Sequence, residues 1–385
     1  MAPSFSYRPA PLNTIRPGLP NSRHFPERPI DTEITPAFST MTVDKANVLL
    51  IGCGGIGTIG ALNLEVGGKA AVTAVLRSNY EMAQEKGFHI RSCDHGLVEG
   101  FRPSSILKSV PDVEKECLKP FNYIVCTTKN IPDVPPALAE LIRPAVTPGH
   151  SVIVLAQNGL NIEKPLISAF PDNIVLSGVS FCGSHEVESG EILHEDYDEI
   201  FIGPFHNPNV EWSAQEAAAK HFVDIYGAGG KTKAHFTADV GFSRWRKLLY
   251  NACLNPICAL TDLDTGRIQL CEAGANSLVR PAMEEIRSAA AACGFDLPAE
   301  LVDFMLTLDP IQMYNPPSMQ VDLRKGRFCE FENIVGEPLR EGLKHGVPMP
   351  TLTVIYNMLR CVQWRMKEKK GLVEIPPHKD FTNTK

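Results

Sequence analysis

A short apolar run followed at once by clustered glycines constrains the fold more than any other feature of this chain. Residues 47–51 read NVLLI, which predicts a buried strand, and residues 52–57 read GCGGIG, which fits the pattern GxGxxG. An apolar helical stretch follows and ends at a pair of glycines. Strand, glycine loop and helix in this order are typical of a dinucleotide-binding α/β unit, in which the pyrophosphate lies against the helix N-terminus. The candidate cofactor-binding residues of the loop are Gly52, Cys53, Gly54, Gly55, Ile56 and Gly57.

The end of the next predicted strand, residues 72–77, indicates which nucleotide is bound. NAD-specific sites place an acidic residue roughly 20 positions beyond the loop, where it binds the ribose 2′-hydroxyl. Here the strand is expected to end in Arg77, followed by Ser78 and Asn79, with no acidic residue. An arginine can pair with a 2′-phosphate, so the sequence favours NADPH. The alternative is an arginine that is merely solvated at the surface.

The remaining pattern predicts two domains. Apolar runs at residues 123–128, 151–157, 174–181 and 199–205 alternate with helical segments, which predicts a mostly parallel sheet covered on both faces. After about residue 237 only helical patterns occur. We therefore expect an α/β fold in which a Rossmann-type N-terminal domain is followed by an all-helical C-terminal domain. The expected bounds are a disordered, proline-rich arm at 1–45, the Rossmann-type domain at 46–237, the helical domain at 238–370 and a tail at 371–385.

Composition excludes several classes of partner. A net charge of −7 and a pI near 5.9 argue against nucleic acid, and no apolar run is long enough for a membrane span. The 11 cysteines are scattered, without CxxC or paired-histidine spacing, so we predict reduced thiols, no disulfide framework and no metal. We expect a cytoplasmic protein. The basic start of the arm also fits a mitochondrial transit peptide, although its prolines argue against one.

A polar stripe on an otherwise apolar helix marks the predicted second domain. Lys247, Asn251 and Asn255 stand at i, i+4 and i+8 and therefore share one helix face. Burying these groups without partners would cost several kcal/mol, so the stripe either faces solvent or lines a polar cleft. Its narrowness and its lack of carboxylates favour a cleft. Pro256, one residue further on, predicts a kink. A second polar cluster, at residues 318–330, could equally be an exposed loop.

In these motifs and their order, the chain resembles the ketopantoate reductases (2-dehydropantoate 2-reductases) from about residue 47 to residue 365. The resemblance implies a helical domain like the C-terminal domain of 6-phosphogluconate dehydrogenase. It also implies the NADPH-dependent reduction of 2-dehydropantoate to (R)-pantoate by hydride transfer. The partner would be a small-molecule 2-oxo acid, and the sequence leaves the oligomeric state open, with a homodimer as one option.

The same resemblance assigns roles residue by residue. It implies that Lys247 is the general acid, with Glu330 as the acidic residue that holds its ammonium group. It also implies that Asn251, Asn255 and Ser318 bind the substrate. Lys129 would lie near the nicotinamide end of the cofactor, and Asn158 would contact both cofactor and substrate. Asp322 and Arg324 belong to the same motif without a clear role. Thr265 stands where some members carry a substrate-contacting asparagine.

That departure leaves the substrate open. The alternatives are a related reductase that acts on another 2-oxo acid or ketone, for example in secondary metabolism, and a catalytically silent NADPH-binding protein. A silent protein would be expected to have lost the cleft residues, and all of them are present in this sequence.

Overall fold

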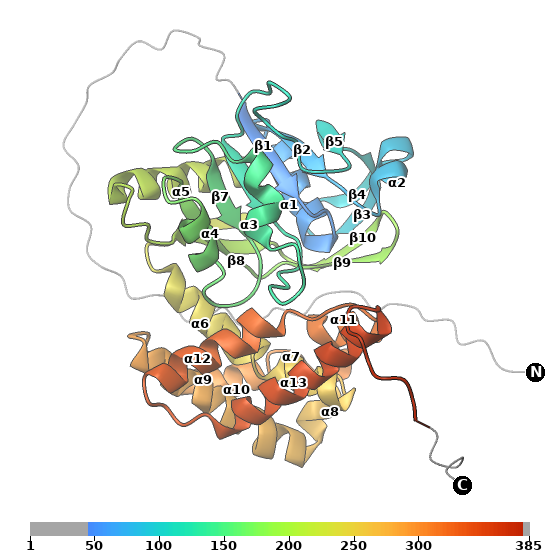
Figure 1. Cartoon of the computed structure of the whole chain (residues 1–385), viewed down its shortest axis with the longest axis vertical. Coiled ribbons are helices and arrows are strands. Elements are labelled where there is room, and N and C mark those ends of the chain that lie inside the picture. The colour runs from blue at the N-terminus through green and yellow to red at the C-terminus, as the bar shows by residue number, and fades with distance from the viewer. Residues whose placement is uncertain (1–44, 380–385) are drawn as a thin grey trace, which may run out of the picture. The chain divides into compact units, whose positions relative to one another are not determined.

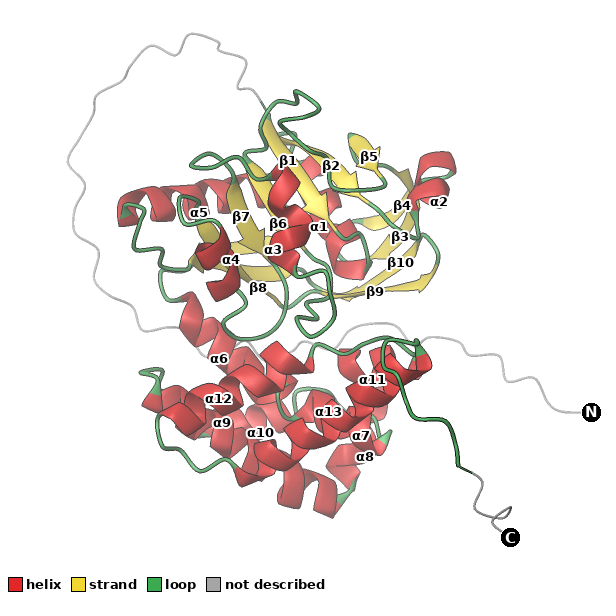
Figure 2. Ribbon diagram, in the orientation of Figure 1, coloured by secondary structure: helices red, strands yellow, loops and turns green. Residues whose placement is uncertain are grey.

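An eight-stranded sheet forms the centre of the first half of the chain in the computed structural model, which describes residues 45–379 (Figures 1 and 2). Neighbouring strands run parallel except β8 and β11, which are antiparallel. This agrees with the mostly parallel sheet that the sequence predicts. In sheet order the strands are β12 (Lys233–Phe236), β11 (Glu199–Pro204), β8 (Val175–Ser180), β7 (Val152–Leu155), β6 (Tyr123–Cys126), β1 (Ala46–Ile51), β2 (Ala70–Val75) and β5 (Ser105–Leu107).

Two apolar cores lie on the two faces of this sheet because successive side chains of a strand point to opposite sides. On one face, Val48 and Leu50 of β1 belong to the same core as residues of α1 and α5. On the other face, Leu49 and Ile51 share a core with residues of α3 and α4. The helices of this half are α1 (Gly55–Val66), α2 (Tyr80–Glu85), α3 (Leu138–Ile142), the 3-10 turn η1 (Arg143–Ala145), α4 (Lys164–Ala169) and α5 (Trp212–Tyr226).

A second sheet, which the sequence analysis missed, has the strand order β4-β3-β10-β9. Its strands carry many polar and exposed residues, so they lack the apolar runs that mark the central sheet. β3 and β10 pair in parallel, with Ser92 opposite His194. The four strands are β3 (Phe88–Ser92), β4 (Gly96–Phe101), β9 (Gly183–Glu188) and β10 (Glu191–Asp196).

Among residues 45–379, every regular element after β12 is helical, as predicted (Figure 2). These helices pack around one large apolar core that includes Trp245 of α6 and Met283 of α9. They are α6 (Val240–Asn251), α7 (Leu254–Thr261), α8 (Thr265–Leu270), the π-helical η2 (Ala273–Val279), α9 (Arg280–Ala292), α10 (Glu300–Leu306), the 3-10 turn η3 (Ile311–Met313), α11 (Ser318–Arg324), the π-helical η4 (Glu332–Gly336), α12 (Glu337–Lys344) and α13 (Pro350–Lys369).

Two local expectations are corrected. The expected kinked helix is two helices, because α6 ends at Asn251 and α7 begins at Leu254. Pro256 lies in the first turn of α7, where backbone N–H groups have no partner within the helix, so a proline is tolerated there. In the sheet, β2 ends at Val75, and Arg77 therefore lies in the turn after the strand.

The expected domain bounds remain predictions. The arm predicted at 1–45 falls outside the described residues except for Lys45. Of the predicted tail, residues 371–379 form no helix or strand, and the rest is not described. None of the described helices combines the length and the apolar character that crossing a bilayer requires.

Candidate functional site

The glycine loop after β1 has the backbone geometry that a phosphate site requires. Gly52 has φ +100°, a region that favours glycine, and a Cβ on Gly57 would lie 1.9 Å from the Gly52 carbonyl oxygen. A Cβ on Gly54 would meet nothing within 4 Å, and no side chain caps the start of α1. The side chain of Cys53 is buried in the core, so this residue offers only its backbone to a ligand. The loop therefore fits a bound pyrophosphate.

Arg77 lies where a cation could meet the ribose end of a dinucleotide. Its side chain is exposed and makes no hydrogen bond or ion pair with other residues in the described range 45–379. Nearby, the Asn79 amide donates a 2.6 Å hydrogen bond to Glu186 of β9. The guanidinium of Arg77 is thus available for an anionic group.

Lys247 and Asn251 of α6 line one pocket with Asn158 and Gly159 of the loop after β7. The half-buried Lys247 ammonium donates a hydrogen bond to the carbonyl oxygen of Ser180, at the end of β8. Burial, and next the positive charge of a nearby arginine, lower the pKa of Lys247 to about 8. A lysine with this pKa is a proton donor matched to neutral pH.

Asn255, the third residue of the stripe, lies apart from this pocket. Asn255 is in the first turn of α7, is only 2% exposed, and its Oδ1 has no hydrogen-bond partner among the described residues. Ser318, the first residue of α11, is exposed and does not line the pocket either. Thr265 is buried and its hydroxyl donates to the Asn315 carbonyl at 3.2 Å.

A buried pair of carboxylates holds Lys129, which follows β6. The Lys129 ammonium lies 2.8 Å from Asp322 Oδ2 and 3.1 Å from Glu330 Oε2. Burial alone would lower the pKa of Lys129, but the charges of Glu330 and Asp322 outweigh that effect and raise it. We expected Glu330 to hold the Lys247 ammonium; instead it pairs with Lys129 and accepts from the Asn130 N–H at 2.9 Å. Its charge acts on Lys247 only from a distance.

Arg244, one turn before Lys247, is a residue that the sequence analysis missed. Its side chain is 5% exposed and donates to the carbonyl oxygens of Gln157 and Gly159 at 3.0 and 2.8 Å. Its Nε lies 2.9 Å from Glu163 Oε1. Arg244 therefore fixes the backbone on both sides of Asn158. A charged residue on an otherwise apolar, buried helix face was the signal that could have identified it.

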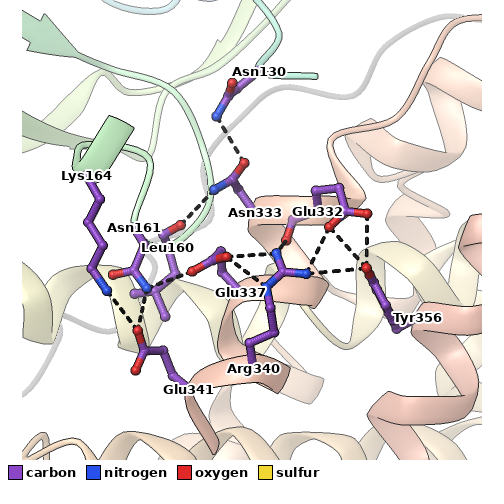
Figure 3. Close-up of polar contacts among 10 residues, drawn as sticks. All are labelled: Asn130, Leu160, Asn161, Lys164, Glu332, Asn333, Glu337, Arg340, Glu341 and Tyr356. Carbon is purple, nitrogen blue, oxygen red and sulfur yellow. Dashed lines mark hydrogen bonds and ion pairs between the residues drawn. The ribbon is translucent and has the colours of Figure 1, made fainter. Parts of the chain in front are cut away.

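Helical segments near the C-terminus hold the same loop from the other side (Figure 3). Leu160 N donates to the Asn333 carbonyl at 2.8 Å, and Asn333 Nδ2 donates to the Leu160 carbonyl at 3.0 Å. The Asn130 amide donates to Asn333 Oδ1 at 3.2 Å, which also ties the loop after β6 to η4. A Cβ on Gly159 would lie 2.6 Å from Asn333 Cβ, so the backbones approach closely here.

A Rossmann-type domain with an open glycine loop, followed by a helical domain that supplies a lysine of lowered pKa, is the architecture of a two-domain oxidoreductase that uses a dinucleotide. Residues 48–207 match the family described as "Ketopantoate reductase PanE/ApbA", and residues 239–363 match its C-terminal part. The chain belongs to this family of oxidoreductases.

Individual relatives show how far the likeness extends. The chain is 37% identical over 350 residues to an uncharacterized protein of Saccharomyces cerevisiae, covering 86% of this chain and 97% of the relative. The crystal structure of 2-dehydropantoate 2-reductase from Methylococcus capsulatus is 32% identical with a TM-score of 0.65, covering 83% of this chain and 97% of the other. The ternary structure of D-mandelate dehydrogenase with NADH and anilino(oxo)acetate is 19% identical and has a TM-score of 0.70. The match covers 83% of this chain and 99% of the other and is a likeness of fold.

Proposed function

We propose that the protein reduces 2-dehydropantoate to (R)-pantoate with NADPH, and that Lys247 donates the proton. The observation that carries this proposal is the position of Lys247. A lysine of lowered pKa shares a pocket with Asn251 of its own helix and with Asn158, on a loop of the dinucleotide-binding domain. This arrangement supports a proton donor and two amides that act where substrate and cofactor would meet.

Each side chain has a definite task in this proposal. Bound NADPH would supply a hydride to the 2-oxo carbon. As negative charge develops on the carbonyl oxygen, the Lys247 ammonium stabilises it and transfers a proton. The Ser180 carbonyl orients that ammonium. Glu330 and Asp322 keep Lys129 charged, and this lysine would contact the cofactor.

The remaining assignments belong to the proposal as predictions. The glycine loop, Arg77, Lys129 and Asn158 bind the cofactor, and Asn251, Asn255 and Ser318 bind the substrate. The structure places Asn255 and Ser318 outside the pocket that Lys247 lines, so their contacts would require the substrate to extend beyond it or the site to close around it. A cytoplasmic location is part of the same prediction, and a homodimer is one option for the oligomeric state.

The decisive experiment is NADPH oxidation by the full-length protein with and without 2-dehydropantoate, beside a panel of other 2-oxo acids. We expect oxidation to depend on 2-dehydropantoate and to yield the (R) product. Faster turnover of another 2-oxo acid would instead identify a related reductase of different specificity. Tight NADPH binding without turnover of any substrate would identify a silent binding protein.

The lowered pKa of Lys247 predicts a falling pH profile. The proton donor must be protonated, so activity is full below the pKa of Lys247, about 8, and declines as pH rises through that value. We expect kcat to fall about tenfold per pH unit on the alkaline side. The measurement is kcat between pH 6 and pH 10 at saturating substrate, with Lys247→Arg as the comparison. The same alkaline decline in Lys247→Arg would show that another group titrates.

The choice of cofactor depends on Arg77. Arg77→Ala removes a charge-assisted contact to a 2′-phosphate, which corresponds to a loss of about 10- to 100-fold in NADPH affinity. NADH lacks that phosphate, so its dissociation constant should hardly change. Fluorescence titration with both nucleotides measures the difference, and Arg360→Ala, an exposed arginine on α13, is the matched control. Equal losses for the two nucleotides would contradict the assignment.

A further inference from the structure

Parallel pairing of β3 and β10 creates a second cluster of reactive side chains. The register places Ser92 opposite His194, which brings Cys93 and Asp94, just beyond β3, beside His194. One ligand atom from each of Cys93, Asp94 and His194 lies within 4.8 Å of the other two. Thiolate, carboxylate and imidazole are the protein ligands of zinc, and three of them with an open fourth position are a common arrangement. The cluster shares no residue with the pocket around Lys247.

The histidine of this cluster is buried and incompletely bonded. The His194 side chain has no exposed surface, and its Nε2 has no hydrogen-bond partner among the described residues. Leaving a buried polar atom unpaired costs about 1–3 kcal/mol, so the position of Nε2 requires an explanation. Its nearest anionic neighbour is Asp94 Oδ2 at 3.7 Å.

The distance between His194 Nε2 and Asp94 Oδ2 distinguishes a direct hydrogen bond from a shared metal ion. A hydrogen bond between nitrogen and oxygen would need about 2.7–3.2 Å, so His194 and Asp94 are too far apart for one. Two ligands of one tetrahedral zinc, with bonds of about 2.0–2.2 Å, lie about 3.3–3.5 Å apart. The observed 3.7 Å between Nε2 and Oδ2 is therefore close to the spacing that a shared ion would impose.

Surrounding groups hold both ligands in place. His194 Nδ1 lies 2.8 Å from Ser92 Oγ, and this oxygen also accepts from the N–H groups of Asp94 and His95 at 3.1 and 2.9 Å, so the hydroxyl fixes the orientation of the imidazole ring. Asp94 Oδ2 accepts from the Asp198 N–H at 2.9 Å. The Asp198 carboxylate is in turn held by the Tyr226 hydroxyl at 2.8 Å. Cys93 is exposed, which leaves a path for the ion and a place for a water ligand.

A second cluster, with glutamate in place of aspartate, lacks these features. Cys293, Glu341 and His345 also bring three possible ligand atoms within 4.8 Å of one another. However, Glu341 Oε1 already accepts from Lys164 and Asn161, each at 2.8 Å (Figure 3). His345 is exposed. Neither Glu341 nor His345 has a buried side-chain nitrogen or oxygen without a partner. This cluster serves as an internal control.

We propose that Cys93, Asp94 and His194 bind one zinc ion, with water as the fourth ligand. The ion would join the β3–β4 turn to β10, and its binding would release the Cys93 thiol proton to solvent. The sequence spacing gave no sign of this site, because Cys93 and His194 meet only through the strand pairing.

The test uses the full-length protein, stripped with a chelator and titrated with zinc chloride by calorimetry. We expect one tight site, an affinity at least about 100-fold weaker in Cys93→Ser and in His194→Gln, and no change in Cys293→Ser. Titration with cobalt(II) should give a thiolate-to-metal absorption band that is lost only in Cys93→Ser.

Cys93→Ser keeps the test decisive if the buried His194→Gln variant fails to fold, because Cys93 is exposed. Absence of stoichiometric zinc binding by the unaltered protein would overturn the proposal. Equal affinity in Cys93→Ser, or loss of the site in Cys293→Ser, would overturn it as well. None of these readouts depends on reductase activity, so the proposed function stands or falls separately.

Discussion

Lys247→Ala is expected to lower kcat by about 100- to 10,000-fold, the usual contribution of a positioned general acid. Among residues 45–379, the substitution removes the one ammonium group that lines the pocket with Asn158 and Asn251. It leaves the glycine loop and Arg77 untouched, so the NADPH dissociation constant should stay nearly constant. Steady-state kinetics with the best 2-oxo acid and fluorescence titration with NADPH measure the two quantities.

A matched control separates this effect from a general loss of charge. Lys220→Ala removes an exposed lysine on α5, whose ion pair with Glu216 at 3.6 Å lies within one helix. Its kcat should equal that of the unaltered protein. If Lys247→Ala also kept full turnover, another group would have to supply the proton and the proposed mechanism would be wrong.

Arg244→Met is expected to reduce the free energy of unfolding by about 3–5 kcal/mol, the cost of breaking a buried ion pair from one side. Glu163 is fully buried, and neither of its carboxylate oxygens accepts a hydrogen bond, although Arg244 Nε lies only 2.9 Å away. Its charge is therefore offset mainly by the guanidinium. Without Arg244 the carboxylate would remain buried and uncompensated, and the carbonyl oxygens of Gln157 and Gly159 would lose a donor.

Urea unfolding of the single variant and of Arg244→Met/Glu163→Gln tests this explanation. The second substitution removes the unpaired charge of Glu163 and should recover part of the lost stability, because a neutral amide costs less to bury than a carboxylate. A loss below about 1 kcal/mol in the single variant would mean that water reaches Glu163 and screens it.

The parts of the fold that follow from local pattern could be predicted, and those that depend on pairing between distant segments could not. The apolar run before Gly52 and the helical periodicity after residue 237 gave the two kinds of domain. β9 and β10 were missed because their polar, exposed residues resemble a loop. The sequence predicted an irregularity at Pro256, but the helix breaks several residues earlier, after Asn251. Pro256 fits within the first turn of the next helix.

In the candidate site, too, the contacts set by local spacing could be predicted, and those between distant segments could not. The i, i+4 spacing of Lys247 and Asn251 placed both on one helix face, and the structure brings that face to Asn158. The partner of Glu330 could not be inferred from spacing, because Lys129 reaches it from a loop about 200 positions away in the sequence. The catalytic and binding roles of these residues remain predictions that the kinetic experiments test.

Because Leu160 and Asn333 exchange hydrogen bonds, the conformation of the loop at residues 158–160 depends on both halves of the chain. Its shape is set by a strand on one side and by η4 on the other. Consider a chimera that combines the sheet half of this protein with the helical half of a relative. Its loop at residues 158–160 and its η4 would not match unless both segments came from the same protein. Divergence of specificity within such a scaffold is therefore expected to proceed through paired changes at the loop and at η4.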